Sequence, residues 1–217
     1  PRDRRAARDL VRAGGLVEIN DVSALTHLRD GQAFVAGPFL NIYNEVAAAE
    51  MMRLGCARLS ANVEMPLASI GKLAGTHPGL EIEVFAYGRL PLALSARCYH
   101  ARAHGLNKDN CQYVCDHDLD GMPLATIEGE PVLAANGIQT LSHGVHVLDA
   151  PLDALRAAGI TALRLSPHST GMRRIAEAFR RFTDDEIGPD ELRAQIRATH
   201  PPGPLVDGYV KGLPGMT

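Results

Sequence analysis

The sequence lacks several features that would assign it quickly to a class. No apolar run approaches the roughly 20 residues that a membrane-spanning helix needs, and no charged and then apolar leader opens the chain. We therefore expect a cytoplasmic protein that is not transmembrane. The net charge of -3 gives no general reason to expect nucleic acid as a partner.

Familiar catalytic motifs are missing as well. No Gly-rich phosphate loop follows a predicted strand, which leaves a Rossmann-type dinucleotide site without support. The sequence also lacks the Ser-His-Asp order of a catalytic triad, a His-Glu-x-x-His motif and a nucleophile elbow. Glu128 and Glu130 flank Gly129 at a predicted hairpin turn, where solvated carboxylates are the ordinary interpretation. The motifs therefore do not favour a peptidase.

The pattern that is present is an alternation of strands and helices. With 217 residues, of which 46% are hydrophobic and 22% charged, the chain is long enough to bury a full core. Short apolar runs predict strands at 16–19, 33–36, 58–60, 82–86, 145–148 and 162–165. Amphipathic stretches predict helices at 4–13, 21–28, 45–54, 66–73, 151–158, 171–182 and 189–198. This order is typical of βα units around a parallel sheet.

The predicted fold class is α/β, an incomplete TIM-like (β/α) barrel with an inserted Cys-bearing loop and hairpin. Six strands are too few for a closed barrel of about 250 residues. The chain starts on Pro1 and opens with a helix, so we expect that the first βα units are missing. We expect a single domain over 1–200, with 88–142 as the insertion, a hairpin of 124–127 against 132–135, and an irregular tail over 201–217.

Three of the four cysteines, Cys98, Cys111 and Cys115, fall within 18 residues. Without a secretory signal, reduced thiolates that hold a metal are expected rather than disulfides. Cys98 follows the strand at 82–86, at the barrel face where loops build active sites. Cys56 instead precedes a strand at the opposite face, and is expected to be a small buried hydrophobe.

Three thiolates leave the identity of the metal open. A 4Fe-4S cluster usually takes four cysteines, whereas structural zinc accepts three cysteines and a histidine. His100, His104 and His117 lie in the same loop as possible zinc ligands, although each is ordinary as a solvated side chain. Iron-sulfur and zinc both remain possible at this point.

The stretch over residues 83–98 resembles the signature of the collagenase-like peptidase superfamily. Within that superfamily, the continuation is similar to UbiV-type proteins of oxygen-independent ubiquinone biosynthesis. The matching residues are Ser95-Ala96-Arg97-Cys98, Ala101-Arg102, Lys108-Asp109-Asn110-Cys111-Gln112, Cys115, Asp120-Gly121, Glu128-Gly129-Glu130 and Asn136-Gly137-Ile138-Gln139-Thr140, with Asp207-Gly208-Tyr209 and Pro214-Gly215-Met216 in the tail.

The resemblance implies one 4Fe-4S cluster held by Cys98, Cys111 and Cys115, with a fourth cysteine in a segment before Pro1. It implies a role as the iron-sulfur subunit of an oxygen-independent hydroxylation system. The implied partners are a UbiU-like protein in a heterodimer, a sterol-carrier-like accessory lipid protein and a quinone precursor. A collagenase-like peptidase and a non-catalytic zinc-binding structural subunit are the alternatives. No catalytic residue is predicted.

Overall fold

The computed structural model describes residues 2–213 of the chain, which fall into two compact units. Unit 1 contains the chain up to Phe85, together with Asp153–Arg164 and Tyr209–Gly212. Unit 2 contains Ala86–Leu152 and Leu165–Gly208. No helix in this described part is long and apolar enough to cross a membrane.

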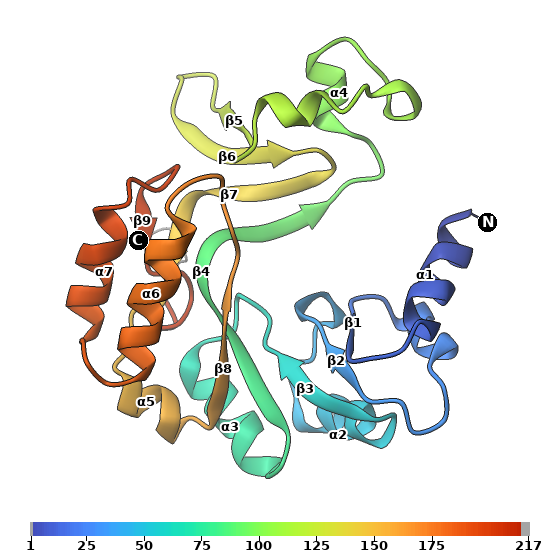
Figure 1. The fold of residues 1–217 in the computed structure, drawn as a ribbon, viewed down its shortest axis with the longest axis vertical. Helices are drawn as coiled ribbons and strands as arrows, with labels where there is room; N and C mark the ends of the chain where they lie inside the picture. Colours follow the sequence, from blue (N-terminus) through green and yellow to red (C-terminus); the bar gives the residue numbers. More distant parts are fainter. Residues whose placement is uncertain (1, 214–217) are drawn as a thin grey trace. The chain divides into compact units, whose positions relative to one another are not determined.

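Unit 1 is built from parallel strands that alternate with helices (Figure 1). Its strands are β1 (Val17–Ile19), β2 (Phe34–Ala36), β3 (Cys56–Ser60), the first part of β4 (Glu81–Leu94) and β8 (Ile160–Leu165). Its helices are α1 (Arg2–Arg12), η1 (Val22–His27), η2 (Pro38–Leu40), α2 (Glu45–Arg53), α3 (Leu67–Thr76) and α5 (Leu152–Ala157). β1, β2, β3 and β4 pair in parallel in that order, and β8 also pairs with β4.

The local sequence explains most of unit 1. Asp21 and Asn44 begin η1 and α2 by accepting hydrogen bonds from the backbone N–H groups of Ser23 and Ala47. The apolar side chains of the strands form the core of the unit, and Phe34 and Ile82 are completely buried. This mixed α/β arrangement is the class expected from the sequence, and it agrees with an incomplete barrel.

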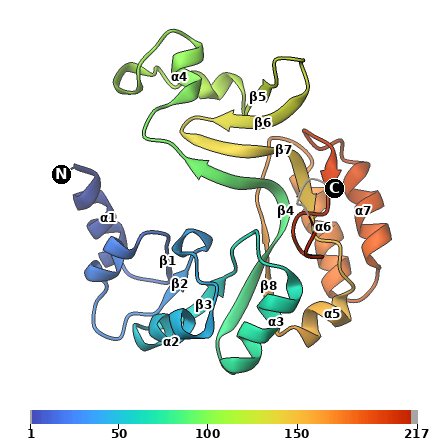
Figure 2. The same ribbon diagram turned by 180° about the vertical axis from the view of Figure 1, so that it is seen from behind.

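Unit 2 combines an antiparallel meander with several helical segments. Its strands are the last part of β4, β5 (Met122–Ala125), β6 (Pro131–Asn136), β7 (Gln139–Val147) and β9 (Leu205–Val206). Its helical segments are α4 (Tyr99–Ala103), η3 (Lys108–Asn110), η4 (Val114–His117), α6 (Met172–Thr183) and α7 (Pro189–Arg197). β4, β7, β6 and β5 pair antiparallel in that order, and α6 and α7 run side by side in both views (Figures 1 and 2).

The predicted hairpin is present as β5 and β6, with Gly129 at the turn in the left-handed region (φ 92°). The strand predicted at 145–148 is wrong in length and direction, because β7 begins at Gln139 and runs antiparallel to β4. A short turn at Gly137 joins β6 to β7, and such a hairpin allows only antiparallel pairing.

Three further expectations are corrected. The helix predicted over 21–28 is a 3-10 helix, η1. Pro66 is the residue before α3 rather than its first residue. The tail is not irregular throughout, because β9 pairs in parallel with β7. The motif Pro214-Gly215-Met216, which is part of the resemblance, lies outside the described residues. The domain boundaries predicted from the sequence stay a prediction.

Candidate functional site

Cys98, Cys111 and Cys115 all lie in unit 2, on the segment 95–121 between β4 and β5, which we call the cysteine segment. Cys98 precedes α4, and its Sγ accepts a hydrogen bond from the backbone N–H of Ala101 at 3.4 Å. Cys111 directly follows η3, and Cys115 lies within η4. The three thiols are free and half-buried, so each is accessible to a metal without being fully solvated.

The backbone between Cys111 and Cys115 is unusual. Gln112 and Tyr113 are consecutive non-glycine residues with φ values of 50° and 54°. Side chains with a Cβ rarely adopt this left-handed region, and each such residue costs of order 1 kcal/mol. Strained residues of this kind cluster at ligand-binding segments, so the turn marks the cysteine segment as a functional candidate.

Cys56 has a different environment from the other three thiols. It lies at the start of β3 in unit 1 with 7% of its surface exposed, and its Sγ donates to the carbonyl of Arg58 at 3.1 Å. Burial raises the pKa of the Cys56 thiol. The sequence predicted that Cys56 is a small buried hydrophobic residue, and its burial is confirmed.

The three thiols do not form a ligand set for a single ion. Among the residues that the structure describes, only one set of three potential metal donors has its ligand atoms mutually within 4.8 Å, and that set contains no cysteine. In a 4Fe-4S cluster each cysteine binds a different iron, so its thiolates need not lie this close together. The spacing of the three thiols thus does not match the ligand set of a single ion, and it leaves open a cluster whose ligands bind different irons.

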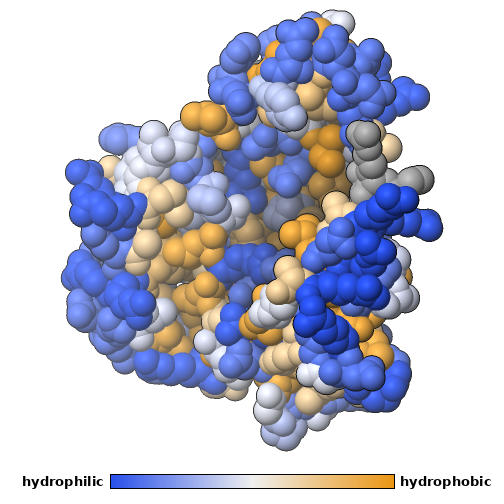
Figure 3. Space-filling model, turned by 45° about the vertical axis from the view of Figure 1, so that its right-hand side comes forward, coloured by the Kyte–Doolittle hydropathy of each residue, from blue (hydrophilic) through white to orange (hydrophobic). Residues whose placement is uncertain are grey.

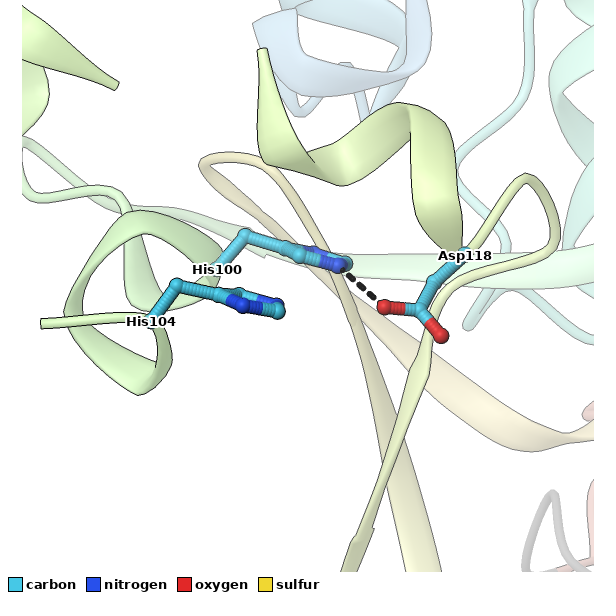
Figure 4. Close-up of side chains that lie close together, drawn as sticks. All are labelled: His100, His104 and Asp118. Atoms are coloured by element: carbon cyan, nitrogen blue, oxygen red, sulfur yellow. Dashed lines mark hydrogen bonds and ion pairs between the residues drawn. The ribbon is translucent and has the colours of Figure 1, made fainter. Parts of the chain in front are cut away.

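The compact donor set consists of His100, His104 and Asp118 (Figure 4). His100 is completely buried, and its Nε2 lies 2.8 Å from Oδ2 of Asp118. The ring of His104 stacks on that of His100, with centroids 6.1 Å apart and ring planes 3° from parallel. Two of the three histidines considered as zinc ligands are thus brought together, but with Asp118 and not with the thiols.

His117, the third histidine considered, lies at the edge of this group. Its ring centroid is 6.0 Å from that of His104, at a steep angle. Sequence reasoning missed Asp118, although its position in the cysteine segment, only 18 residues after His100, was a usable signal.

A second polar cluster lies where β4 and β8 continue into unit 2. The hydroxyl of Tyr87, a completely buried residue, lies 3.0 Å from Nδ1 of His168. Asp120 accepts hydrogen bonds from the backbone N–H of Ser169 at 2.6 Å and from its Oγ at 2.5 Å. Burial raises the pKa of Tyr87, and the charge of Asp120 raises it further.

His168 was not singled out from the sequence. Burial lowers its pKa, the charge of Asp120 acts in the opposite direction, and Arg89 lowers it further. His168 is therefore a neutral imidazole near pH 7, hydrogen-bonded to the Tyr87 hydroxyl through Nδ1. The available signal was its place three residues after β8, since polar residues beyond barrel strands often have functional roles.

One comparison with known proteins decides the family. The family model described as "Peptidase family U32" matches residues 13–215, which is nearly the whole chain. The chain belongs to peptidase family U32. This confirms the resemblance to the collagenase-like peptidase superfamily, while no solved structure gives a significant match.

Membership of family U32 does not by itself assign a catalytic mechanism to this chain. Ser169 Oγ donates to Asp120 and not to a histidine, so this serine does not form the serine–histidine pair of a catalytic triad. Glu128 and Glu130 are exposed at the β5–β6 turn, as expected for solvated carboxylates. The geometry of these residues gives a U32 peptidase activity no further support.

The surface over the cysteine segment, at the top of Figure 3, is mostly hydrophilic. Three large side chains with apolar surface are exposed on this segment nevertheless: Tyr99, Tyr113 and Leu119. Tyr113 is 75% and Leu119 67% exposed, on either side of Cys115. Tyrosine is enriched at protein interfaces, so these exposed side chains are the residues of the segment to consider for a partner contact.

Proposed function

We propose that this member of family U32 is the iron-sulfur subunit of an oxygen-independent hydroxylation system in ubiquinone biosynthesis. It acts with a UbiU-like protein, a sterol-carrier-like accessory lipid protein and a quinone precursor as substrate. The proposal combines the UbiV-type motif of the cysteine segment with the family membership.

The observation that carries the proposal is the contrast among the four cysteines. Cys98, Cys111 and Cys115 are free and half-buried on one segment, whereas Cys56 is buried in the other unit. Iron-sulfur ligands must be thiolates that an iron ion can reach. The three accessible thiols meet this requirement and would hold a 4Fe-4S cluster together with a fourth ligand from elsewhere.

A bound cluster would supply one-electron transfer without oxygen, which amino-acid side chains cannot provide. The chain's own residues would hold it and adjust its surroundings. The N–H of Ala101 donates to Sγ of Cys98, and such hydrogen bonds stabilise a thiolate. Arg97, Arg102 and Lys108 are exposed on the same segment and would offset the negative charge of three thiolates.

The partner contact is proposed on the same segment. Tyr113 and Leu119 are exposed there beside the thiols, and a UbiU-like partner would cover them on binding. A contact at this place would also exclude water from the cluster, which protects iron-sulfur centres and shifts their potential.

The first test is the metal content of protein purified without oxygen. We expect about four iron atoms per chain, the stoichiometry of a 4Fe-4S cluster. Substituting Ala for Cys98, Cys111 or Cys115 should deplete the iron, and Cys56→Ala is the matched control that should retain it. Stoichiometric zinc without iron would contradict the proposal and favour the zinc-binding structural subunit.

The second test is physiological. Cells that lack the protein should make ubiquinone in air, where oxygen-dependent hydroxylases act, and lose it under anaerobic growth with accumulation of under-hydroxylated precursors. Mass spectrometry of the quinone pools measures both, and a Cys98→Ala strain should match the deletion. Unchanged anaerobic ubiquinone in the deletion strain would reject the assignment and leave the peptidase and the structural subunit as the alternatives.

A further inference from the structure

The cysteine segment carries a second set of possible metal ligands, which the proposed function does not involve: His100, His104 and Asp118. His100 and His104 are four residues apart across the single turn of α4, a spacing that puts both side chains on one face of a helix. Asp118 directly follows η4 and faces the ring of His100 (Figure 4). Two separate helical segments thus bring three donors to one point.

We propose that these three side chains bind a single first-row divalent metal ion of the Zn²⁺ type, at a site separate from the thiols. Two imidazole nitrogens and one carboxylate form a donor set that such ions accept, with remaining positions for water or substrate. The inference stands on the geometry of these residues and does not depend on the iron-sulfur proposal.

The distances suit one ion after small side-chain movements. All three ligand atoms lie within 4.8 Å of one another, and the closest pair, Nε2 of His100 and Oδ2 of Asp118, is 2.8 Å apart. Zinc lies about 2.0–2.1 Å from each ligand, so donors around one ion are a little over 3 Å apart. His100 and Asp118 would separate slightly, and the exposed ring of His104 would rotate inward.

The hydrogen bonds of His100 define the proton that a metal ion would displace. The backbone N–H of Gly137 points at Nδ1 from 3.4 Å, so the neutral ring carries its proton on Nε2 and donates it to Asp118. When the ion takes Nε2, this proton moves to Nδ1 and the Gly137 contact is lost. Nδ1–H then faces the Gly137 N–H, so the ring must turn away from that donor, and this adjustment lowers the metal affinity.

Burial of the three donors differs in a way that suits an open site. His100 is completely buried and held in place, Asp118 is half-buried, and His104 is exposed. A fixed inner ligand and an exposed outer ligand give the ion a path in from solvent. The exposed side leaves a coordination position open, as in catalytic rather than structural zinc sites.

The test uses the full chain with Cys98, Cys111 and Cys115 replaced by serine, so that no metal-thiolate site can form. Titration with Zn²⁺ by calorimetry and with Co²⁺ by visible absorption should show one ion per chain. His104→Ala should weaken the affinity by at least about 100-fold, since the loss of even an outer-shell partner costs 10–100-fold. His27→Ala, at a histidine in unit 1, is the matched control.

Asp118→Asn separates metal binding from a purely structural hydrogen bond. Its amide oxygen still accepts from His100 Nε2, so thermal unfolding of the metal-free chain should be nearly unchanged, while the loss of the negative charge should weaken Zn²⁺ binding about as much as His104→Ala. Absence of binding, or binding that survives either substitution, overturns the proposal. Iron content in the unsubstituted protein tests the iron-sulfur proposal independently.

Discussion

Arg164→Ala should be among the more destabilising substitutions in unit 1, because Arg164 joins two strands through their acidic side chains. From β8 it donates Nε–H to Oε1 of Glu83 on β4 at 2.6 Å. Its two terminal nitrogens bond to the carboxylate of Glu18 in β1. Glu83 is only 9% exposed, and its other cationic neighbour, Arg58, lies 3.8 Å away.

The magnitude follows from what remains after the guanidinium is removed. The bond to Glu83 is charge-assisted and largely buried, and its loss costs about 2 kcal/mol including the poorly compensated carboxylate. The pair with Glu18 is about one-third exposed on the acidic side, and pairs of that exposure contribute at most about 1 kcal/mol. We therefore expect the free energy of unfolding to fall by about 2–3 kcal/mol, short of the 3–5 kcal/mol for a fully buried pair.

The loss should depend on pH. Burial raises the pKa of Glu18, but its hydrogen bonds with Arg164 and Asn20 lower it, and the result lies below the ordinary value of 4.5. The stabilisation from Glu18 is complete above that value and is lost as the pH falls below it, because the unfolded chain then binds the proton more readily. The difference between native protein and Arg164→Ala should thus shrink in acid.

Urea denaturation followed by circular dichroism, at pH 7 and below pH 4, measures both effects. The matched control is Arg53→Ala in the same unit, since Arg53 pairs with Glu50 on the exposed face of α2. The control should change the unfolding midpoint much less. An Arg164→Ala midpoint at pH 7 that equals that of the control would refute the reasoning.

Three further predictions concern packing and titration. Gly88→Ala should lower the free energy of unfolding by at least about 2 kcal/mol, because the φ of Gly88 is 122° and an added Cβ would lie 2.7 Å from the Cβ of Ser166. The control is Gly75→Ala in α3, where an added Cβ meets no atom within 4 Å. Calorimetry should show that this control is neutral or stabilising. NMR spectra should show that the pKa of His168 lies below 6.5, because burial disfavours its charged form. The stability contribution of the neutral ring is complete above pH 6.5 and is lost as the pH falls. A pKa above 6.5 would contradict the burial of His168. In the metal-free chain three thiols should react with a thiol reagent before unfolding and Cys56 only after it; a fast fourth thiol would disprove its burial.

Features that depend on neighbouring residues were predictable from the sequence. The apolar runs of unit 1 became strands, and Asp21 became the residue that begins η1, because capping and strand burial need only a few adjacent side chains. The grouping of Cys98, Cys111 and Cys115 on one segment was visible for the same reason.

The direction of β7 was not predictable from its own residues. An apolar run of strand length pairs equally well with a parallel or an antiparallel neighbour, and the choice depends on how the chain returns to β4. The short turn at Gly137 joins β6 and β7 as a hairpin, which makes β7 antiparallel to β6. β9, from the segment predicted to be an irregular tail, then pairs with β7.

The sequence by itself determined the α/β class, most strand and helix positions and the cysteine segment, because these follow from short-range patterns of apolar residues, caps and thiols. Only the tertiary structure decided which polar groups meet. Tyr87 and His168 are 81 residues apart, and the donors His100 and Asp118 lie on different helical segments. Such meetings depend on the path of the backbone in space, which long-range packing and strand pairing define and which no local pattern encodes.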